Sequence, residues 1–108
     1  MKLTNNEIYG IHSAISEIID QKVSVKTAFK LSKILRSLED VIIICNKIIK
    51  DSNDDEVAEL LNEKTEVNIE KIEVADLDEF EISIRNVAFL NPIINQENVE
   101  SEGGKDGK

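Results

Sequence analysis

Residues 28–49 read AFKLSKILRSLEDVIIICNKII, and the apolar side chains of this stretch recur at alternating spacings of three and four. This seven-residue period is typical of a helix that buries one continuous apolar stripe against another helix. The stripe consists of Ala28, Leu31, Leu35, Leu38, Ile42, Cys45 and Ile49. The pattern predicts one long helix from about Val25 to Lys50.

A shorter apolar stripe of the same kind precedes the long helix. Thr4-Asn5-Asn6-Glu7 fits a capping box, in which the Thr4 hydroxyl accepts from the Glu7 amide and the Glu7 carboxylate reaches back. The box predicts a first helix from about Asn5 to Asp20. Its apolar positions are Thr4, Ile8, Ile11, Ile15 and Ile18. Because only a short turn separates the two helices, we expect an antiparallel helical hairpin.

The period changes after a short third helix expected at about Glu56 to Asn62. Thr65, Val67 and Ile69 alternate with polar residues, as in a half-buried strand, and the alternation returns at Glu79–Ile82. These two runs predict a small two-stranded β element. Ser83 is then expected to cap a helical segment that Pro92 interrupts. The expected fold class is therefore mainly α (α+β), a helical hairpin with a β element and a C-terminal helical segment.

The chain of 108 residues, 41% of them hydrophobic, has the usual length of one domain. We expect a single helical-hairpin domain over 1–94, with the β element at about 63–82. Residues 95–108 are polar and glycine-containing, which predicts a disordered tail.

Cysteine usage and hydropathy point to one compartment. Cys45 is the single cysteine, which favours a reducing environment. The chain opens without the pattern of a signal peptide, and its longest apolar run, Val41–Cys45, is too short for a bilayer. We expect a cytoplasmic protein that does not bind membranes.

The long helix is apolar over more of its circumference than one helical neighbour requires, since Phe29, Ile43 and Ile44 lie outside its stripe. The excess predicts a homo-oligomer, most simply a two-fold dimer. The expected interface consists of Leu31, Leu35, Leu38, Ile42, Cys45 and Ile49.

Negative charge is concentrated in one part of the chain. The net charge is −9, and residues 54–82 hold twelve acidic side chains against two lysines. Such a surface favours a basic partner, for which it could imitate a nucleic-acid backbone. Equally, the acids could only keep the β element solvated and protect its edge. The candidate partner-binding residues are Glu66, Glu70, Glu73, Asp78, Glu79 and Glu81.

Other polar residues yield no predicted chemistry. His12 is the single histidine and lacks ligand spacing around it, so no metal is expected. Cys45 sits in an apolar stripe, where it acts as a small hydrophobe. No cofactor site or catalytic set is recognised, and we expect no enzyme. A stripe of basic residues could bind the phosphates of a nucleic acid. The negative net charge instead favours one of two other roles: the solvent-exposed side of the helix, or a surface that pairs with the acidic segment. The members of this basic stripe are Lys22, Lys26, Lys30, Lys33 and Arg36.

Four stretches carry a resemblance to a known family. They read KLTNNEIYGIHSAISEII, KVSVKTAFKLSKILRSLE, VAELLNEKTEVNIEKI and DLDEFEISIRNVAFLNPII, and together they fall within residues 2–94. Their order resembles small phage and prophage proteins of unknown function from low-GC Gram-positive bacteria. This chain has Ser24 and Ile84 where that family often has proline. The resemblance implies a phage-encoded protein in the host cytoplasm and carries over no catalytic residue.

Two functions are expected from these observations. The first is a non-enzymatic phage-type accessory or assembly protein that acts through contacts of its helical hairpin with itself or with phage or host proteins. The alternative is a phage-encoded inhibitor, in an anti-defence or host-takeover role, that binds a host protein through the acidic 54–82 face. Nucleic acid is not an expected partner of either.

Overall fold

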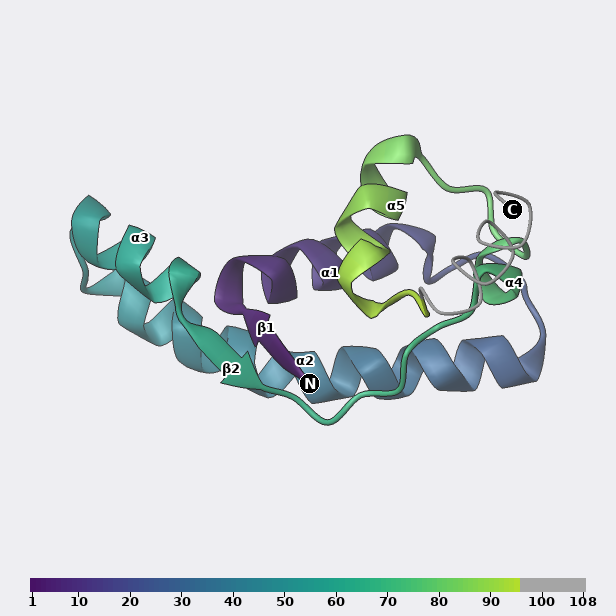
Figure 1. Cartoon of the computed structure of the whole chain (residues 1–108), viewed down its shortest axis with the longest axis horizontal. Coiled ribbons are helices and arrows are strands. Elements are labelled where there is room, and N and C mark those ends of the chain that lie inside the picture. Colours follow the sequence, from purple (N-terminus) through teal and green to yellow (C-terminus); the bar gives the residue numbers. More distant parts are fainter. Residues whose placement is uncertain (96–108) are drawn as a thin grey trace, which may run out of the picture.

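The computed structural model describes residues 1–95, which form a mainly helical fold with one two-stranded antiparallel sheet. Figure 1 shows α1 and α2 side by side in opposite directions, with α2 as the long base of the molecule. The elements are β1 (Lys2–Thr4), α1 (Asn5–Ile18), α2 (Val25–Lys50), α3 (Asp54–Asn62), β2 (Lys64–Glu66), α4 (Val74–Leu77), α5 (Ile84–Leu90) and the 3₁₀ helix η1 (Asn91–Ile93).

The predicted hairpin of two helices is confirmed, and local capping explains where its helices begin. The Thr4 hydroxyl accepts from the Glu7 N–H at 3.0 Å, and the Glu7 carboxylate accepts from the Thr4 N–H at 2.8 Å. The Ser24 hydroxyl caps α2 by accepting from the Thr27 N–H. These bonds satisfy backbone groups that the first turn leaves unpaired. The α1 stripe is buried as predicted at Ile8, Ile11, Ile15 and Ile18.

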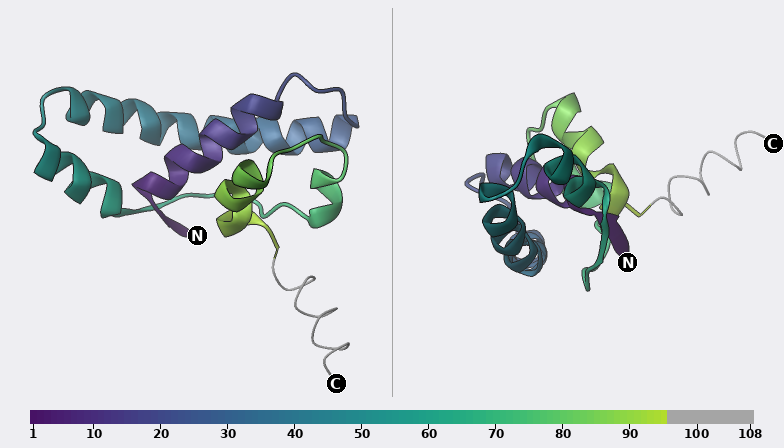
Figure 2. Two further views of the ribbon diagram at one scale, coloured as in Figure 1. Left: turned by 90° about the horizontal axis from the view of Figure 1, so that it is seen from above. Right: turned by 90° about the vertical axis from the view of Figure 1, so that its left-hand side faces the viewer.

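α1 lies between α2 on one side and α5 on the other, and Figure 2 shows this layering from above. The close approach of α5 depends on Gly10. A Cβ added there would lie 3.1 Å from Cδ1 of Phe89, which is tighter than ordinary contact. Leu90 and Ile93, both fully buried, complete the core on this side of α1.

The sheet differs from the expected β element. β2 pairs with β1, in the register Lys2 with Glu66, Leu3 with Thr65 and Thr4 with Lys64. The predicted second strand at Glu79–Ile82 is wrong, because this segment forms no strand. Instead, the Gln21 side chain forms hydrogen bonds with the backbone of this segment. It accepts from the Glu81 N–H at 2.9 Å and donates to the Glu81 carbonyl at 2.8 Å.

The C-terminal segment closes the fold against the middle of the chain. Ser83 caps α5 as predicted, accepting from the Asn86 N–H at 3.1 Å, and Pro92 falls in η1, where the α-helix has ended. Ile72 then forms a parallel bridge with Ile94. The Asn95 N–H donates to the Ile72 carbonyl at 2.7 Å, so the contacts extend one residue beyond the expected boundary at 94. The rest of the predicted tail, 96–108, lies outside the described residues.

Candidate functional site

The residues predicted to form an oligomer interface lie mostly inside a single chain. Leu31, Leu35 and Leu38 belong to the core cluster, and Leu38 has no exposed surface. Cys45 is buried as well, while Ile42 and Ile49 are half-buried. The stripe is therefore used largely for packing within the chain, although Ala28 at its start is exposed. The oligomer interface itself stays a prediction.

Apolar surface remains on the opposite side of the C-terminal half of α2. Ile43, Ile44 and Ile48 are 52%, 59% and 46% exposed. Within residues 1–95 each of these side chains thus keeps about half of its surface exposed, and α2 lies at an edge of the molecule in both views of Figure 2. Single exposed isoleucines are ordinary, but three within six residues of one helix form a patch. This patch is the strongest candidate for a functional surface.

Charged side chains flank the patch in a regular order. Between Arg36 and the C-cap residue Asp51, six residues fall within about 100° of arc at 100° per residue. We call them the outer stripe: Arg36, Asp40, Ile43, Ile44, Lys47 and Asp51. All six are exposed. None of its four charged side chains takes part in an ion pair within residues 1–95. The stripe thus presents unpaired charge and apolar surface together.

α3 adds a strongly acidic neighbour to this half of α2. Its first turn holds Asp54, Asp55 and Glu56, which follow the cap residue Asn53. None of its residues is fully buried, so α3 and the end of α2 form a thin arm (Figure 1). Asn5 ties the arm to α1. Its Nδ2 donates to the Leu60 carbonyl at 2.8 Å, and its Oδ1 accepts from the Thr65 hydroxyl at 2.6 Å.

The six acidic residues predicted to bind a partner do not form one free face. Glu66 accepts from the N-terminal ammonium of Met1 at 2.5 Å, a contact that lowers the pKa of its carboxyl. Glu79 accepts from the Thr27 hydroxyl and the Ser24 N–H. Glu73 accepts from the Asn95 amide at 2.9 Å. The exposed members of the set are Glu66, Glu70, Asp78, Glu79 and Glu81.

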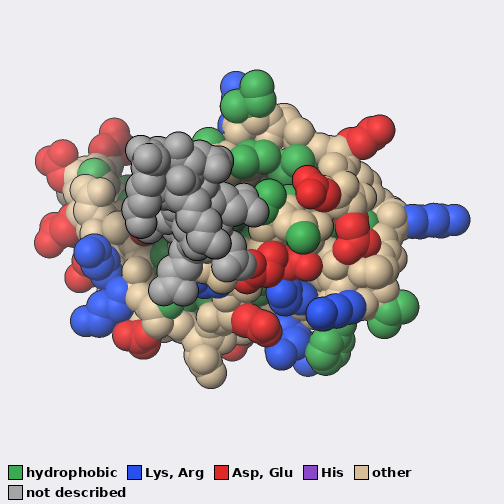
Figure 3. Space-filling view, turned by 45° about the vertical axis from the view of Figure 1, so that its right-hand side comes forward, with side chains coloured by type: hydrophobic (Ala, Val, Ile, Leu, Met, Phe, Trp, Pro, Cys, Tyr) green, Lys and Arg blue, Asp and Glu red, His purple; other side chains and the backbone are tan. Residues whose placement is uncertain are grey.

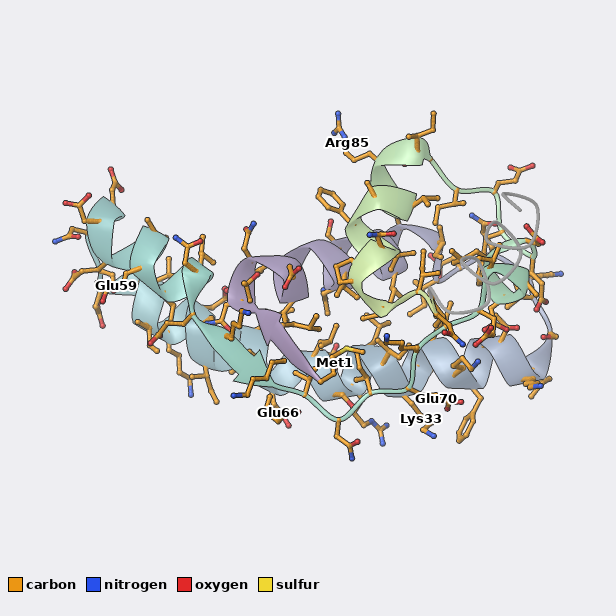
Figure 4. All side chains as sticks on the ribbon, in the orientation of Figure 1. Met1, Lys33, Glu59, Glu66, Glu70 and Arg85 are labelled. Carbon is orange, nitrogen blue, oxygen red and sulfur yellow. The ribbon has the colours of Figure 1, made fainter. Side chains whose placement is uncertain are left out.

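Part of the basic stripe pairs with the acidic segment. This is one of the two roles, besides phosphate binding, that the sequence suggested for the stripe. Lys30 Nζ lies 2.9 Å from Asp76 Oδ2. Lys33 instead lies over the Phe29 ring, 5.5 Å from its centroid. Figure 3 shows blue and red side chains intermixed on this side, and Figure 4 places Lys33 and Glu70 next to each other. A surface of such mixed charge is a poor track for phosphates.

His12 and Cys45 lie where the sequence placed them, on the flank and within the apolar stripe of their helices. His12 Nε2 is 3.9 Å from Glu39 Oε2 on α2. Burial raises the pKa of the Cys45 thiol, and the nearby Glu63 charge raises it further. The thiol is thus held away from its nucleophilic form. Within residues 1–95, no group of three or more His, Cys, Asp or Glu side chains could hold a metal ion.

Sequence reasoning did not foresee a shallow groove between α1 and α5. Its lining residues are Asn6, Glu7, Tyr9, Gly10, Ser13, Ala88, Phe89 and Pro92. The Tyr9 hydroxyl at one edge donates to the Asn46 side chain at 2.5 Å. The groove is open and holds no charged side chain except Glu7, so it offers few groups that could orient a ligand.

Comparisons with known proteins add no constraint to this geometry. No protein-family model, curated protein or solved structure gives a significant match to the chain. Within residues 1–95, no helix combines the length and hydropathy that a bilayer crossing requires.

Proposed function

We propose that this chain acts as a non-enzymatic accessory or assembly protein through protein–protein contacts of its helical hairpin, with the outer side of α2 as the contact surface. The observation that carries the proposal is the exposed apolar patch of Ile43, Ile44 and Ile48. Contiguous apolar surface bordered by charge is typical of protein interaction sites. The phage-type setting is also part of the proposal, and it rests on the family resemblance alone.

The thin arm supports the same proposal. α3 shields only one side of the end of α2, since Val57, Leu60 and Leu61 are half-buried against it. On the opposite side of α2 the isoleucines keep about half of their surface in water. Burial of that remaining surface by a partner would contribute about 1 kcal/mol for each side chain. A cytoplasmic location belongs to the proposal too, because the lone thiol of Cys45 is suited to a reducing compartment.

Site-directed photo-crosslinking tests the proposal. A photoreactive amino acid is placed at Ile44 or Ile48 of the full chain expressed in bacterial cells, and at Val25 as the control. Val25 lies on the same helix, is 86% exposed and stands outside the patch. We expect discrete crosslinked products from positions 44 and 48 but none from 25. The same weak, diffuse labelling at all three positions would contradict the proposal.

A second candidate function is the charge-directed inhibitor. Within its predicted acidic face, residues 54–82, the acids of α3 support this function more than the six candidate partner-binding residues do. The exposed acids of α3 and the residue after it make no ion pair within residues 1–95: Asp54, Asp55, Glu56, Glu59 and Glu63. Binding through them would weaken steeply with salt. If partner capture survives high salt and the double change Asp55→Lys, Glu59→Lys, this candidate is wrong.

A further inference from the structure

We infer that the partner at the outer stripe is a second copy of this chain, with the two α2 helices packed antiparallel about a two-fold axis between Ile43 and Ile44. The inference deepens the proposed function and rests on it. Its basis is the order of charges along the stripe. Arg36 and Asp51 each lie seven residues outside the central pair, and Asp40 and Lys47 each lie three residues outside it.

A two-fold axis at the central pair makes this order self-complementary. Each residue then faces the one at the same distance on the other side of the centre. Arg36 faces Asp51 of the partner subunit, and Asp40 faces Lys47 of the partner subunit. Ile43 faces the partner's Ile44, so the apolar residues meet at the centre of the contact. Four opposite-charge pairs surround four isoleucines.

The parallel arrangement of the same helices is unfavourable. In a parallel pair each residue lies beside its own copy, so Asp40 would meet the partner's Asp40 and Lys47 the partner's Lys47. Like charges in register oppose association. The order of positive and negative charges along the outer stripe therefore favours an antiparallel orientation, with a second copy of this chain as the partner.

The surface is accessible for such packing. All six residues of the outer stripe are exposed, and none of its charges is paired within residues 1–95. α2 itself lies at an edge of the molecule (Figure 2). From Arg36 to Asp51 it covers about 24 Å of helix at 1.5 Å per residue. A contact of one helix pair is small, so we expect a weak dimer that depends on protein concentration and salt.

Two single charge reversals test the register. Asp40→Lys and Lys47→Glu are each made in the full chain, and mass is followed by sedimentation equilibrium over a wide range of concentration. Each reversal turns two opposite-charge pairs of the dimer into like-charge pairs. We expect each variant alone to lose about tenfold or more in association constant. Lys71→Glu, at an exposed lysine in the loop after β2, is the control with the same change of net charge as Lys47→Glu and is expected to dimerise like the wild type.

Mixing the two variants gives the decisive result. A heterodimer of Asp40→Lys with Lys47→Glu has opposite charges at both contacts, so the 1:1 mixture should dimerise more strongly than either variant alone. Circular dichroism and thermal unfolding establish that both variants are folded. If the mixture stays monomeric, or if the wild type is monomeric throughout, the inference is overturned. Crosslinking from position 44 to a different protein would then still support the proposed function. If neither dimerisation nor such crosslinking is seen, both the inference and the proposed function are wrong.

Discussion

Lys30 and Asp76 form an ion pair with 2.9 Å between Nζ and Oδ2, although 46 residues separate them in the chain. Both side chains are nearly enclosed, with exposed fractions of 14% and 15%. The same carboxylate oxygen accepts from the Glu73 N–H at 2.9 Å, at the start of α4. One carboxylate therefore joins the short helix α4 to the long helix α2.

We expect the loss of either partner to destabilise the fold. Lys30→Met retains much of the side-chain volume but removes the charge that faces Asp76, and Asp76→Asn removes the other charge. Each should cost about 1–3 kcal/mol, since hydrogen bonds to charged groups in enclosed sites are strong. The measurement is urea unfolding of both single variants and of the double variant. Lys22→Met, at an exposed lysine outside α2, is the control. If the two single losses simply add in the double variant, the pair is not coupled.

Acid should weaken the same region through two carboxyls. The Thr27 hydroxyl and the Ser24 N–H lower the pKa of Glu79. Burial would raise the pKa of Asp76, but the Glu73 N–H and the Lys30 ammonium outweigh it and lower this pKa. In the unfolded chain both groups titrate near pH 4, at about their ordinary values. Because the folded values lie lower, both groups stabilise the fold above this pH, and the contribution is lost as the pH falls through the folded values.

The checking measurement is thermal unfolding at a series of pH values from neutral to strongly acidic. The wild type should lose more stability on acidification than the double variant Asp76→Asn, Glu79→Gln, which lacks both titrating groups. Parallel curves for the two proteins would show that these carboxyls are not the groups responsible.

Local patterns predicted the helices well, and long-range pairing poorly. Capping residues and apolar periods are short-range signals, and α2 begins and ends at the expected Val25 and Lys50. β1 is only three residues long and pairs with residues 60 or more positions away, so no local sequence pattern predicts it. The alternation at Glu79–Ile82 was misleading, because Ser24, Thr27 and Gln21 bind this segment through side chains.

The residues of the predicted interface are mostly buried within the chain for a related reason. An apolar period shows which side of a helix is buried but not what buries it. Leu31 and Leu38 have the spacing of an interhelical stripe whether the neighbour belongs to the same chain or to another. The isoleucines outside that stripe, Ile43 and Ile44, were visible in the sequence, and both are exposed in the described chain. The sequence predicted that extra cover was needed, and the structure shows where the uncovered surface lies.

Removing the side chain of Asn5 should loosen the arm. This side chain is 4% exposed and bonds both Leu60 and Thr65, so Asn5→Ala leaves a carbonyl and a hydroxyl without their partner. We expect a loss of about 2 kcal/mol and faster hydrogen exchange in α3. Asn6→Ala, at the exposed neighbouring residue, is the control. Unchanged exchange in α3 would show that the arm is anchored elsewhere.

The two sides of α2 should respond differently to truncation of a side chain. Leu38→Ala opens a cavity in the core and should cost about 2–5 kcal/mol. Ile44→Ala changes an exposed position and should stay within about 0.5 kcal/mol in dilute solution, where the chain is monomeric. Urea unfolding at low protein concentration measures both. Similar losses at the two positions would mean that Ile44 is buried in the monomer.

The helices that pack on the outer side of α1, α5 and η1, are the last elements of the described chain, so this side of the fold can form only late in synthesis. α1 is made first, yet it receives its cover from Leu90 and Ile93, which leave the ribosome after almost every other described residue. Until then Ile8, Ile11 and Ile15 have α2 as a neighbour on one side and water on the other. A nascent or truncated chain that stops before residue 90 therefore exposes an apolar surface of isoleucines. Such a chain is expected to bind chaperones or to aggregate.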